Sequence, residues 1–382
     1  MNVTLNSVAI VQSMFAVRVI ARFRKIASRS KPDLTLPSVD EGTRLSVVVP
    51  VLNESHRLPR CLAGLAVQSE VNLEILIVDG GSTDDTVALA REAALNDPRI
   101  RVITAGEAPR STNGKVHNLE AGLRASDPSS SFIVTIDADV LLSAGVCHEL
   151  FSRAISSEAG VLSVATRQQL QSRGAFLLHP AMLTTLVYRF GPPGMLTSDP
   201  ELVQANGQCM IIRRDVLDAL GGFAPFHHTI AEDFAIARKA ASAGYTVGLL
   251  EFESDATVAM YASASDTWNN WPRSLPLPEQ QSARHTILGL FDLSVVQTLP
   301  LLILAMRVLG VRLPGVLVIV NTALFLLRLG VLIGTAKAYR PRSMLFWLSP
   351  LSDGPVTYAL WRSLLRKDHQ WRGRSISRGN SL

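Results

Sequence analysis

Two aspartates inside an apolar run are the first residues of this sequence whose types and spacing suggest chemistry. Asp137 and Asp139 lie in the stretch FIVTIDADVLL, residues 132–142, which otherwise has the composition of a strand in a hydrophobic core. Side chains two apart along a strand share a face, so both carboxylates point the same way unless the strand breaks at Asp139. Two carboxylates at such a short distance raise each other's pKa unless they share a cation. Mg²⁺ or Mn²⁺, bound through oxygen ligands and substrate phosphates, would compensate them.

Polar groups also follow the two preceding apolar runs. The stretch VVVPVLNES carries Pro50 and Glu54, and ILIVDGGSTDDT carries Asp79 followed by two glycines. Ligands of open α/β sheets bind at the carboxyl ends of the strands, so both motifs belong on one rim. Taken alone, DGGST would also fit an ordinary turn between strand and helix, with Ser82 as the helix cap.

Two further motifs place charged groups at the starts of expected helices. NGKVHNLEAG carries Lys115, which could meet an anionic ligand, although a solvated surface lysine is the ordinary interpretation. AEDFAIARKAASAGY carries Glu232 and Asp233, and a carboxylate there could accept a proton from a reacting hydroxyl group. The alternative is a helix whose acidic first turn is favoured by the helix dipole.

The elements that must position these residues alternate between strand and helix. Apolar, β-branched runs begin near residues 45, 73, 100 and 132, and helix-like segments occupy 56–69, 84–95 and 114–125. Strands that alternate with helices of 10–15 residues indicate parallel βαβ units. The expected fold class is therefore α/β, with a mostly parallel sheet.

The composition suggests that this α/β unit is attached to a membrane region. Hydrophobic residues make up 47% of the 382 residues and charged ones 18%, and the apolar excess lies after residue 285. Basic clusters at 18–31 and 362–378 fit a cytoplasmic membrane surface with anionic lipid. Nucleic acid is not expected as a partner, because no aromatic-interleaved basic motif or zinc pattern accompanies the charge.

Two long apolar runs could cross a bilayer. Residues 286–306 and 313–335 each have about the ~20 residues that a spanning helix needs. Asp292 and Arg328 interrupt them, so a buried soluble hairpin is the alternative. For residues 1–20, a membrane anchor and an amphipathic surface helix fit equally well.

A third apolar segment, residues 343–361, is broken by prolines, a glycine and Asp353. The basic tail stays on the cytoplasmic side only if this segment does not cross, so a re-entrant or interfacial segment is expected. The expected organisation is an N-terminal anchor and linker at 1–43, the α/β domain at 44–280, and a helical membrane region with a basic tail at 281–382.

The three cysteines are not spaced as ligands or as a disulfide framework. Cys61, Cys147 and Cys209 are far apart and show no CxxC or Cys/His pattern. A reducing compartment and buried positions in the core are expected.

Six motifs in order resemble those of the family-2 glycosyltransferases, which have the nucleotide-sugar-binding GT-A fold. They are PVLNE, VDGGSTDDT, GK..NL..G, DAD, GQCMIIRRDVLDALGGF and AEDF, and the resemblance covers about residues 44–260. The resemblance implies that Pro50, Glu54 and Asp79 hold the nucleotide. It also implies that Asp137 lies near the ribose or metal, that Asp139 ligates the metal, and that Asp233 is the general base. Glu232 is the alternative base.

The chemistry of sugar transfer fits this assignment. The departing diphosphate must be neutralised, which a divalent cation, Mg²⁺ or Mn²⁺, and Lys115 would do. The acceptor hydroxyl must lose its proton as it attacks the sugar, which Asp233 would accept. A single displacement with a carboxylate base inverts the anomeric centre, and a UDP-hexose is the expected donor.

The acceptor must be judged from the segment before the membrane region. DTWNNWPRSLPL carries Trp268, Trp271 and Arg273, and lacks the (Q/R)xxRW motif of ceramide glucosyltransferases, to which the resemblance is more distant. The form WxxWxRSL, followed by a membrane hairpin and the ending WLSPLSDGP, is similar to that of bacterial carotenoid glycosyltransferases. Arg273 could hold the diphosphate, and the two indoles could face the sugar or anchor an interfacial helix.

The expected function is inverting, metal-dependent transfer of a sugar to the hydroxyl of an apolar membrane acceptor, most simply a carotenoid. The alternative acceptors are a sphingolipid, a hopanoid, a diacylglycerol or a polyprenyl phosphate. An inactive sugar-nucleotide-binding membrane scaffold is the alternative from another class. The expected location is the cytoplasmic membrane, with several spans and with the catalytic domain facing the cytoplasm.

Overall fold

The structure is a computed structural model. It describes residues 2–27, 44–69, 72–109, 112–252, 255–261, 263–273, 275, 282–365, 368–371 and 374–377. The side chains of residues 2–4, 26–27, 273 and 368–377 lie outside the described part, as does the linker expected before residue 44.

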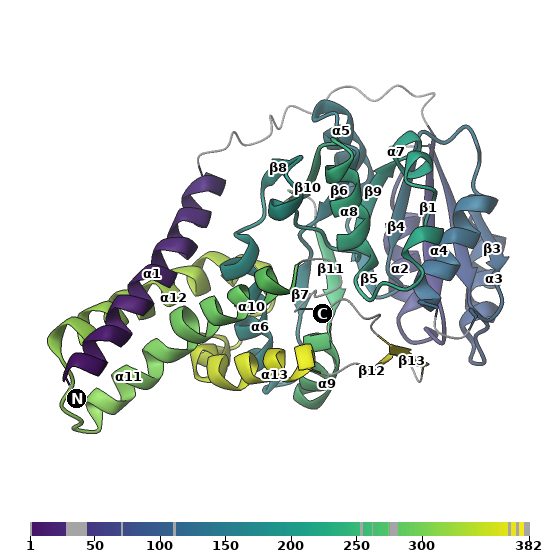
Figure 1. Cartoon of the computed structure of the whole chain (residues 1–382). Coiled ribbons are helices and arrows are strands. Elements are labelled where there is room, and N and C mark those ends of the chain that lie inside the picture. Colours follow the sequence, from purple (N-terminus) through teal and green to yellow (C-terminus); the bar gives the residue numbers. More distant parts are fainter. Residues whose placement is uncertain are drawn as a thin grey trace.

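An eight-stranded sheet forms the centre of the α/β part (Figure 1). Its strands are β1 (Arg44–Val51), β2 (Asn72–Asp79), β3 (Ile100–Thr104), β4 (Phe132–Ile136), β6 (Val161–Val164), β8 (Met195–Thr197), β9 (Cys209–Arg213) and β10 (Val247–Leu250), in the order β3-β2-β1-β4-β9-β6-β10-β8. The first four strands of that order pair in parallel, as the alternation of strands and helices predicted. The sheet as a whole is mixed, because β9 runs antiparallel to both β4 and β6, and β8 runs antiparallel to β10.

Helices cover both faces of this sheet. One face carries α2 (Leu58–Ala66), α3 (Thr86–Asn96) and α5 (Val146–Ser156), and the other carries α4 (Gly114–Ala125), α7 (Arg214–Ala219) and α8 (Glu232–Ser242). The alternation of β1 shows why both faces are apolar: Val47 and Val49 join the first core, and Val48 joins the second. A parallel strand covered on both faces needs such a continuous apolar run.

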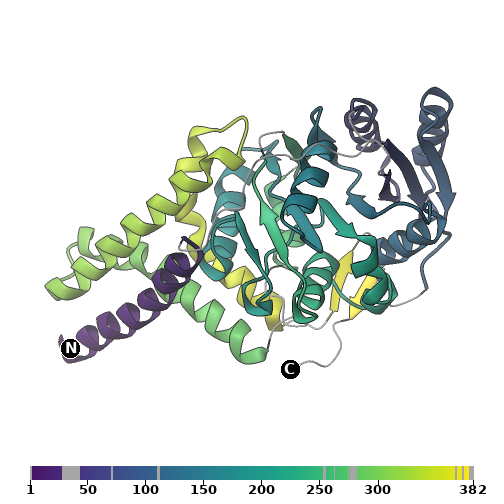
Figure 2. The same cartoon turned by 90° about the horizontal axis from the view of Figure 1, so that it is seen from above.

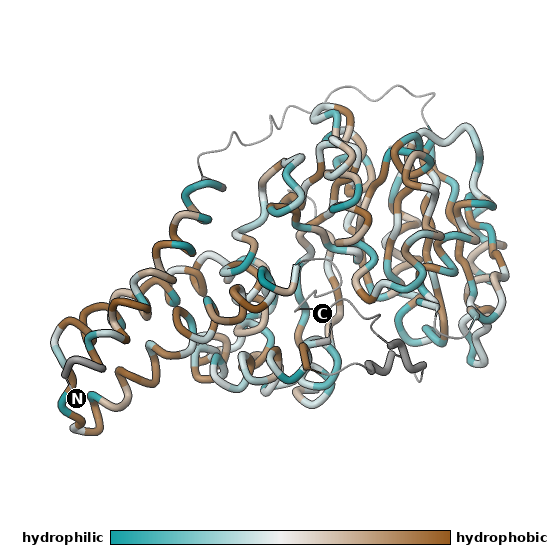
Figure 3. The backbone as a smooth tube through the Cα atoms, in the orientation of Figure 1, coloured by the Kyte–Doolittle hydropathy of each residue, from teal (hydrophilic) through white to brown (hydrophobic). Residues whose placement is uncertain are grey.

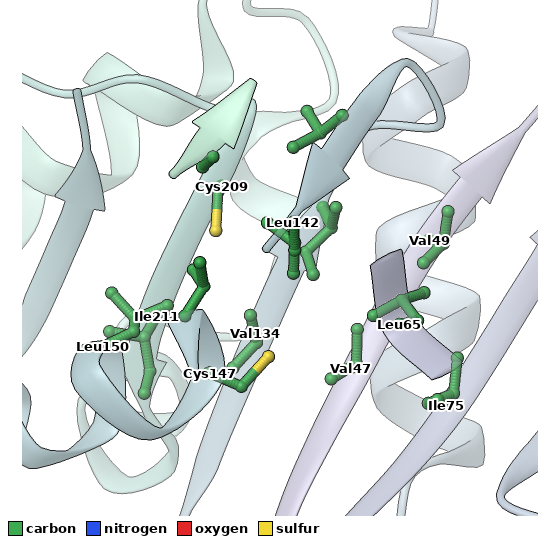
Figure 4. Close-up of a cluster of buried hydrophobic side chains, with 14 of the residues drawn as sticks. Val47, Val49, Leu65, Ile75, Val134, Leu142, Cys147, Leu150, Cys209 and Ile211 are labelled. Carbon is green, nitrogen blue, oxygen red and sulfur yellow. The ribbon is translucent and has the colours of Figure 1, made fainter. Parts of the chain in front are cut away.

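The first core also contains the cysteines. Cys61, Cys147 and Cys209 are buried and unbonded, as expected, and Figure 4 shows the last two among Val134, Leu150 and Ile211. Burial raises the pKa of the Cys147 thiol to about 12, so this side chain is unreactive.

A small second sheet lies beyond the end of β4. It consists of β5 (Val140–Leu142), β11 (Ala256–Ala259) and β7 (Arg167–Gln169), with β11 in the middle. Beyond the helical region, β12 (Asp368–Trp371) and β13 (Arg374–Ser377) form a separate hairpin.

The rest of the chain forms a helical region that projects from the α/β part (Figures 1 and 2). Its elements are α1 (Asn2–Ala27), α6 (Ala175–Phe190), α10 (Ala283–Asp292), the π-helical turn η4 (Leu293–Thr298), α11 (Leu299–Val308), α12 (Gly315–Thr335), the 3₁₀ segments η5 (Ala336–Ala338) and η6 (Met344–Ser352), and α13 (Asp353–Leu365). Three stretches of the described residues are long and apolar enough to cross a membrane: Leu5–Lys25, Ala283–Val308 and Gly315–Ala338. The backbone along α11 and α12 contains brown stretches in Figure 3, which mark apolar residues.

Asp292 and Arg328, the charged residues expected to interrupt the two long apolar runs, are buried and paired. Asp292 accepts hydrogen bonds from Arg18 and Arg22 of α1, at 3.3 and 3.4 Å. Arg328 forms a two-point ion pair with Asp353, with distances of 2.9 and 3.0 Å. The polar residues that interrupt the apolar runs therefore face the interior of the bundle, as intramembrane polar residues usually do.

Residues 343–361 do not form one long helix. The segment folds as η6 and the start of α13, and the two pack against α6, α10 and α12 through Phe346, Val356 and Leu360. Asp353, at the junction, holds the segment to α12 through Arg328.

Candidate active site

The carboxyl ends of β1, β2 and β4 meet at one rim, where a cleft of about 790 Å³ opens. Its charged and amide-bearing lining residues are Asn53, Glu54, Arg57, Asn113, Lys115, Asn118, Asp137, Asp139, Asn206, Gln208, Glu232, Asp233, Asp266 and Asn270. The cleft therefore gathers six of the predicted site residues, Pro50, Glu54, Lys115, Asp137, Asp139 and Asp233, whereas Asp79 at the end of β2 is not among its lining residues.

The two aspartates of the opening motif lie on a turn. β4 ends at Ile136, and the amide of Val140 donates to the carbonyl of Asp137 at 3.0 Å. The expected fourth strand through Asp139 is therefore too long, because the chain turns before it enters β5. The amide of Asp137 still donates to the carbonyl of Gln208 at 3.0 Å, which ties the turn to the segment before β9.

The cation opposite Asp137 is a lysine of the protein. The Nζ atom of Lys115 lies 2.7 Å from Asp137 Oδ1 and 2.7 Å from Glu232 Oε1. Asn113 caps α4 by accepting from the amides of Lys115 and Val116, which fixes where the lysine side chain leaves the helix. The two carboxylates raise the pKa of the Lys115 ammonium against the opposing effect of burial, so the lysine remains charged.

Asp139 has no such partner among the described residues. Its Oδ1 atom is buried without a hydrogen bond, and burial together with the charge of Asp137 raises its pKa to about 7. A buried carboxylate oxygen without a donor fits a divalent cation. No three His, Cys, Asp or Glu side chains of the described residues group as a complete metal site, so the remaining ligands of such a cation would be phosphate oxygens and water.

Asp233 is held by backbone amides at the start of α8. Its Oδ2 accepts from the amide of Gly207 at 2.6 Å, and its Oδ1 accepts from its neighbour Phe234 at 2.8 Å. Burial and then the charge of Glu232 raise its pKa to about 6, while Lys115 and the two amides act in the opposite direction. A carboxyl group with that pKa is matched to proton transfer near neutral pH.

The loops after β1 and β2 hold each other. The amide of Asn53 donates to Ser82 Oγ at 2.9 Å, and Asn53 Oδ1 accepts from the amide of Thr83 at 2.8 Å. Asp79, buried at the end of β2, accepts from the amides of Gly81 and Ser82 at 3.0 and 3.1 Å. The expectation that Ser82 caps the following helix is wrong, because its hydroxyl binds the neighbouring loop.

α3 begins later than Ser82, at Thr86, with Asp85 in the capping position. The side chain that accepts a hydrogen bond from the first turn belongs to the preceding residue: Asp84 Oδ1 accepts from the amide of Thr86 at 3.0 Å.

The tryptophans expected near the acceptor lie behind the cleft wall. α9 (Ala264–Asn270) and η3 (Trp271–Arg273) follow β11, and Asp266 and Asn270 of this segment line the cleft. Trp268 and Trp271 instead pack into the helical region, where Trp271 stacks on His179 of α6 with 3.9 Å between ring centroids. The side chain of Arg273 lies outside the described residues.

The segment 206–208 is among the cleft residues to which sequence reasoning assigned no role. Gly207 binds Asp233 through its amide, and Gln208 and Asn206 share hydrogen bonds beside it. The motif GQCMIIRRDVLDALGGF contains this segment, but its glycine and amides carry no charge that would have marked them as part of the site.

Comparison with known proteins agrees with this geometry. Residues 46–221 match the family model described as glycosyl transferase family 2. The succinoglycan biosynthesis protein ExoA of Rhizobium meliloti (strain 1021) is 27% identical over 220 residues, which are 56% of this chain and 63% of that protein. The GalNAc(5)-diNAcBac-PP-undecaprenol beta-1,3-glucosyltransferase of Campylobacter jejuni is 29% identical over 31% of this chain and 37% of that protein. The chain thus spans less than two thirds of the length of these relatives.

A solved structure resembles almost the whole chain. The mannosyltransferase PcManGT from Pyrobaculum calidifontis, solved in complex with GDP-Man and Mn²⁺, has a TM-score of 0.54 and 18% identity, over 94% of this chain and 98% of that one. At that identity the likeness concerns the fold. Residues 46–221 match a glycosyltransferase family 2 domain, and the chain has the GT-A fold, joined to helices of which some are apolar enough to span a membrane.

Proposed function

We propose that the chain transfers a sugar from a nucleotide-sugar donor to a hydroxyl group of a lipid-soluble acceptor, with inversion at the anomeric carbon. The observation that carries this proposal is Asp233, a carboxyl group with a pKa of about 6 on the wall of the cleft of a family 2 domain. Its amide partners fix the carboxylate while it retains lone pairs for the acceptor proton.

The donor occupies the rim formed by β1 and β2 in this proposal. Pro50 and Glu54 of the cleft lining hold the nucleotide together with Asp79 at the end of β2, and the loops joined by Asn53 and Ser82 keep these positions fixed. UDP-hexose remains the proposed donor. The mannosyltransferase of similar fold was solved with GDP-Man, so both nucleotides belong in a first assay.

Asp139 would hold the divalent cation, and its buried, unpartnered Oδ1 atom supports this role. The cation would neutralise the charge that develops on the departing diphosphate. Mn²⁺ accompanies the donor in the mannosyltransferase, and Mg²⁺ or Mn²⁺ is proposed here. Asp137, which lies on the same turn but is paired with Lys115, is proposed to lie next to the ribose.

The helical region supports a lipid-soluble acceptor. Helices apolar enough to cross a bilayer begin soon after the cleft wall, and one relative is by its name a glucosyltransferase acting on an undecaprenol-linked saccharide. The proposed acceptor is a carotenoid alcohol, on the resemblance of the WxxWxRSL segment and the ending WLSPLSDGP. Another membrane lipid with a hydroxyl group is the second candidate, which the name of that relative favours.

The test uses the full chain in membranes, with UDP-glucose and GDP-mannose as donors. Asp233→Asn is expected to lower turnover by about 10²-fold or more, the usual contribution of a general base, while Mn²⁺–UDP still binds. Asp218→Asn, at an exposed position of α7 outside the cleft, is the matched control and should behave as the unmodified chain. A loss below about tenfold for Asp233→Asn would contradict the assignment of the base.

Expression in a carotenoid-producing host identifies the acceptor. Mass spectrometry of extracted pigments and lipids should show a hexose added to a carotenoid alcohol, and the Asp233→Asn variant should lack it. A hexose found on another lipid would select the second candidate. Binding of nucleotide sugars without any transfer in this host would favour an inactive scaffold.

A further inference from the structure

Lys115 occupies the junction between the donor side of the cleft and the proposed base. Its ammonium group meets the carboxylates of Asp137 and Glu232 at 2.7 Å each and the carbonyl of Gly207 at 3.3 Å. A lysine has three N–H donors, and these three acceptors match that number. A phosphate group would therefore have to compete with groups of the protein that already surround the ammonium.

The three acceptors come from separate elements. Asp137 follows β4, Glu232 begins α8, and Gly207 precedes β9. Lys115 itself lies in the first turn of α4 and lines the cleft. One side chain therefore connects the turn that carries Asp139 with the helix that carries Asp233.

A single residue, Gly207, connects the proposed base Asp233 with the ammonium group of Lys115. The amide of Gly207 donates to Asp233, and its carbonyl accepts from Lys115. A Cβ atom on Gly207 would lie 3.0 Å from Asp233 Cβ and 3.1 Å from Lys115 Nζ, so no larger residue fits between them without displacement. The placement of Asp233 thus depends on the placement of Lys115.

We propose that Lys115 is a positioning residue, which pairs with Glu232 and Asp137 so that Asp233 alone serves as the base, and that it is not a ligand of the donor diphosphate. The inference rests on the proposed function for its catalytic consequence. Pairing keeps Glu232 occupied, and it offsets the negative charge that Asp233 meets from its neighbour. It also compensates Asp137, which leaves Asp139 as the carboxylate of that turn without a partner among the described residues.

A diphosphate ligand and a positioning residue make different predictions for Lys115→Met. Loss of a charge-assisted phosphate contact would weaken Mn²⁺–UDP binding by about tenfold or more. Loss of a positioning residue leaves that binding little changed and lowers kcat, because Glu232 is then a buried, unpaired charge next to Asp233. We expect the second pattern, with a fall in kcat of about tenfold to 10²-fold.

The double variant K115M/E232Q separates the two roles further. Removing the charge of Glu232 together with that of Lys115 should restore most of the lost kcat, which is the coupling expected of two residues in contact. A phosphate ligand cannot be replaced in this way, so the double variant would then remain as impaired as K115M. E232Q alone is the matched control, since it keeps Lys115 paired with Asp137.

The pH profile provides a readout that a purely structural role would not move. Glu232 and Lys115 are the charged groups that act on Asp233, besides the amides of Gly207 and Phe234. Without Lys115 the negative charge of Glu232 is no longer offset, so the acidic limb of kcat should move to higher pH in K115M. It should return towards that of the unmodified chain in K115M/E232Q.

Isothermal titration with Mn²⁺–UDP and Mn²⁺–GDP, together with initial rates, completes the test. Weakened nucleotide binding in K115M, or no recovery in K115M/E232Q, would overturn the inference. If K115M alone does not fold, the double variant decides, because a lost phosphate ligand would weaken nucleotide binding there as well. Failure of the proposed function is distinguishable: the unmodified chain would then bind Mn²⁺–nucleotide and transfer no sugar.

Discussion

At the scale of single residues, the acidic groups of the cleft differ in what compensates their charge. Asp137 and Glu232 have Lys115, Asp233 has two backbone amides, and Asp139 has a buried oxygen without a donor among the described residues. These environments separate the carboxyl groups by task, because a paired carboxylate is already compensated while a desolvated one binds a proton or a cation more readily.

The pKa of Asp233 predicts an acidic limit to activity. The base must be deprotonated, and burial with the charge of Glu232 raises its pKa to about 6. The rate should therefore fall about tenfold for each pH unit below that value and level off above it. Initial rates measured on both sides of pH 6 check this, with Mn²⁺–UDP binding measured at the same pH values. A rate that stays constant through pH 6 while binding is retained would contradict Asp233 as the base.

The sequence was informative about which acidic residues gather in the cleft and less so about what surrounds them. The unusual charges of Asp137 and Asp139 in an apolar run predicted a compensating cation. The ends of the strands placed their turn beside Glu54, and the family resemblance placed Asp233 in the same site. That Lys115 compensates Asp137 was not predictable, because the contact joins residues of three elements whose relative placement no local pattern encodes.

At the scale of elements, the helical region is joined by buried polar contacts. The pair Arg328–Asp353 has side chains that are 1% and 2% exposed, and Gln297 donates to the same carboxylate at 2.8 Å. Gln12 of α1 and Asn321 of α12 exchange hydrogen bonds of 2.9 Å in both directions. These contacts fix the rotation of each helix, which apolar contacts alone would specify less well.

Asp353→Ala should therefore destabilise the chain strongly. The variant leaves Arg328 as a buried, unpaired charge, and loss of one partner of a buried ion pair costs about 3–5 kcal/mol of the free energy of unfolding. Thermal unfolding in detergent measures the effect. The double variant D353A/R328M removes both charges and should recover much of the loss; an equally unstable double variant would show that packing of Asp353, and not its charge, is what matters.

The elements predicted with success are those whose signal is local. The strands and helices up to residue 125 follow from apolar periodicity, and the two long apolar helical stretches after residue 282 follow from run length. The end of β4 before Asp137, and the antiparallel insertion of β9 between β4 and β6, depend on pairings between distant segments. Those pairings bring Gly207 to Asp233, so they shape the site itself.

At the scale of the whole molecule, the helical region has one end next to the α/β part and another end far from it. Leu5 and Val8 of α1 pack with Leu313 and Leu317 around the turn between α11 and α12. At the other end of α1, Lys25 pairs with Asp199 of the α/β part at 3.4 Å. If the three apolar stretches cross a bilayer, the amino end of α1 and the turn after α11 lie on the side opposite the cleft.

Cysteine labelling tests that arrangement. The three natural cysteines are buried and should not react, so N6C, V311C and K239C, each at an exposed position, can be labelled with an impermeant maleimide. We expect N6C and V311C to react in intact cells and K239C to react after permeabilisation. Reaction of N6C and V311C from different sides would show that α1 does not cross with the hairpin.

The segment α9–η3 has two faces, and this has a consequence for engineering. Asp266 and Asn270 line the cleft, whereas Trp268 and Trp271 pack among α6, α10 and α12. A chimaera cut at the apparent domain boundary near residue 280 would give one parent's cleft wall to another parent's anchoring helices. To exchange acceptor preference between relatives, α6, α9–η3 and the helices α10–α12 should be transferred together. These elements lie far apart in the chain, so several segments must be replaced at once.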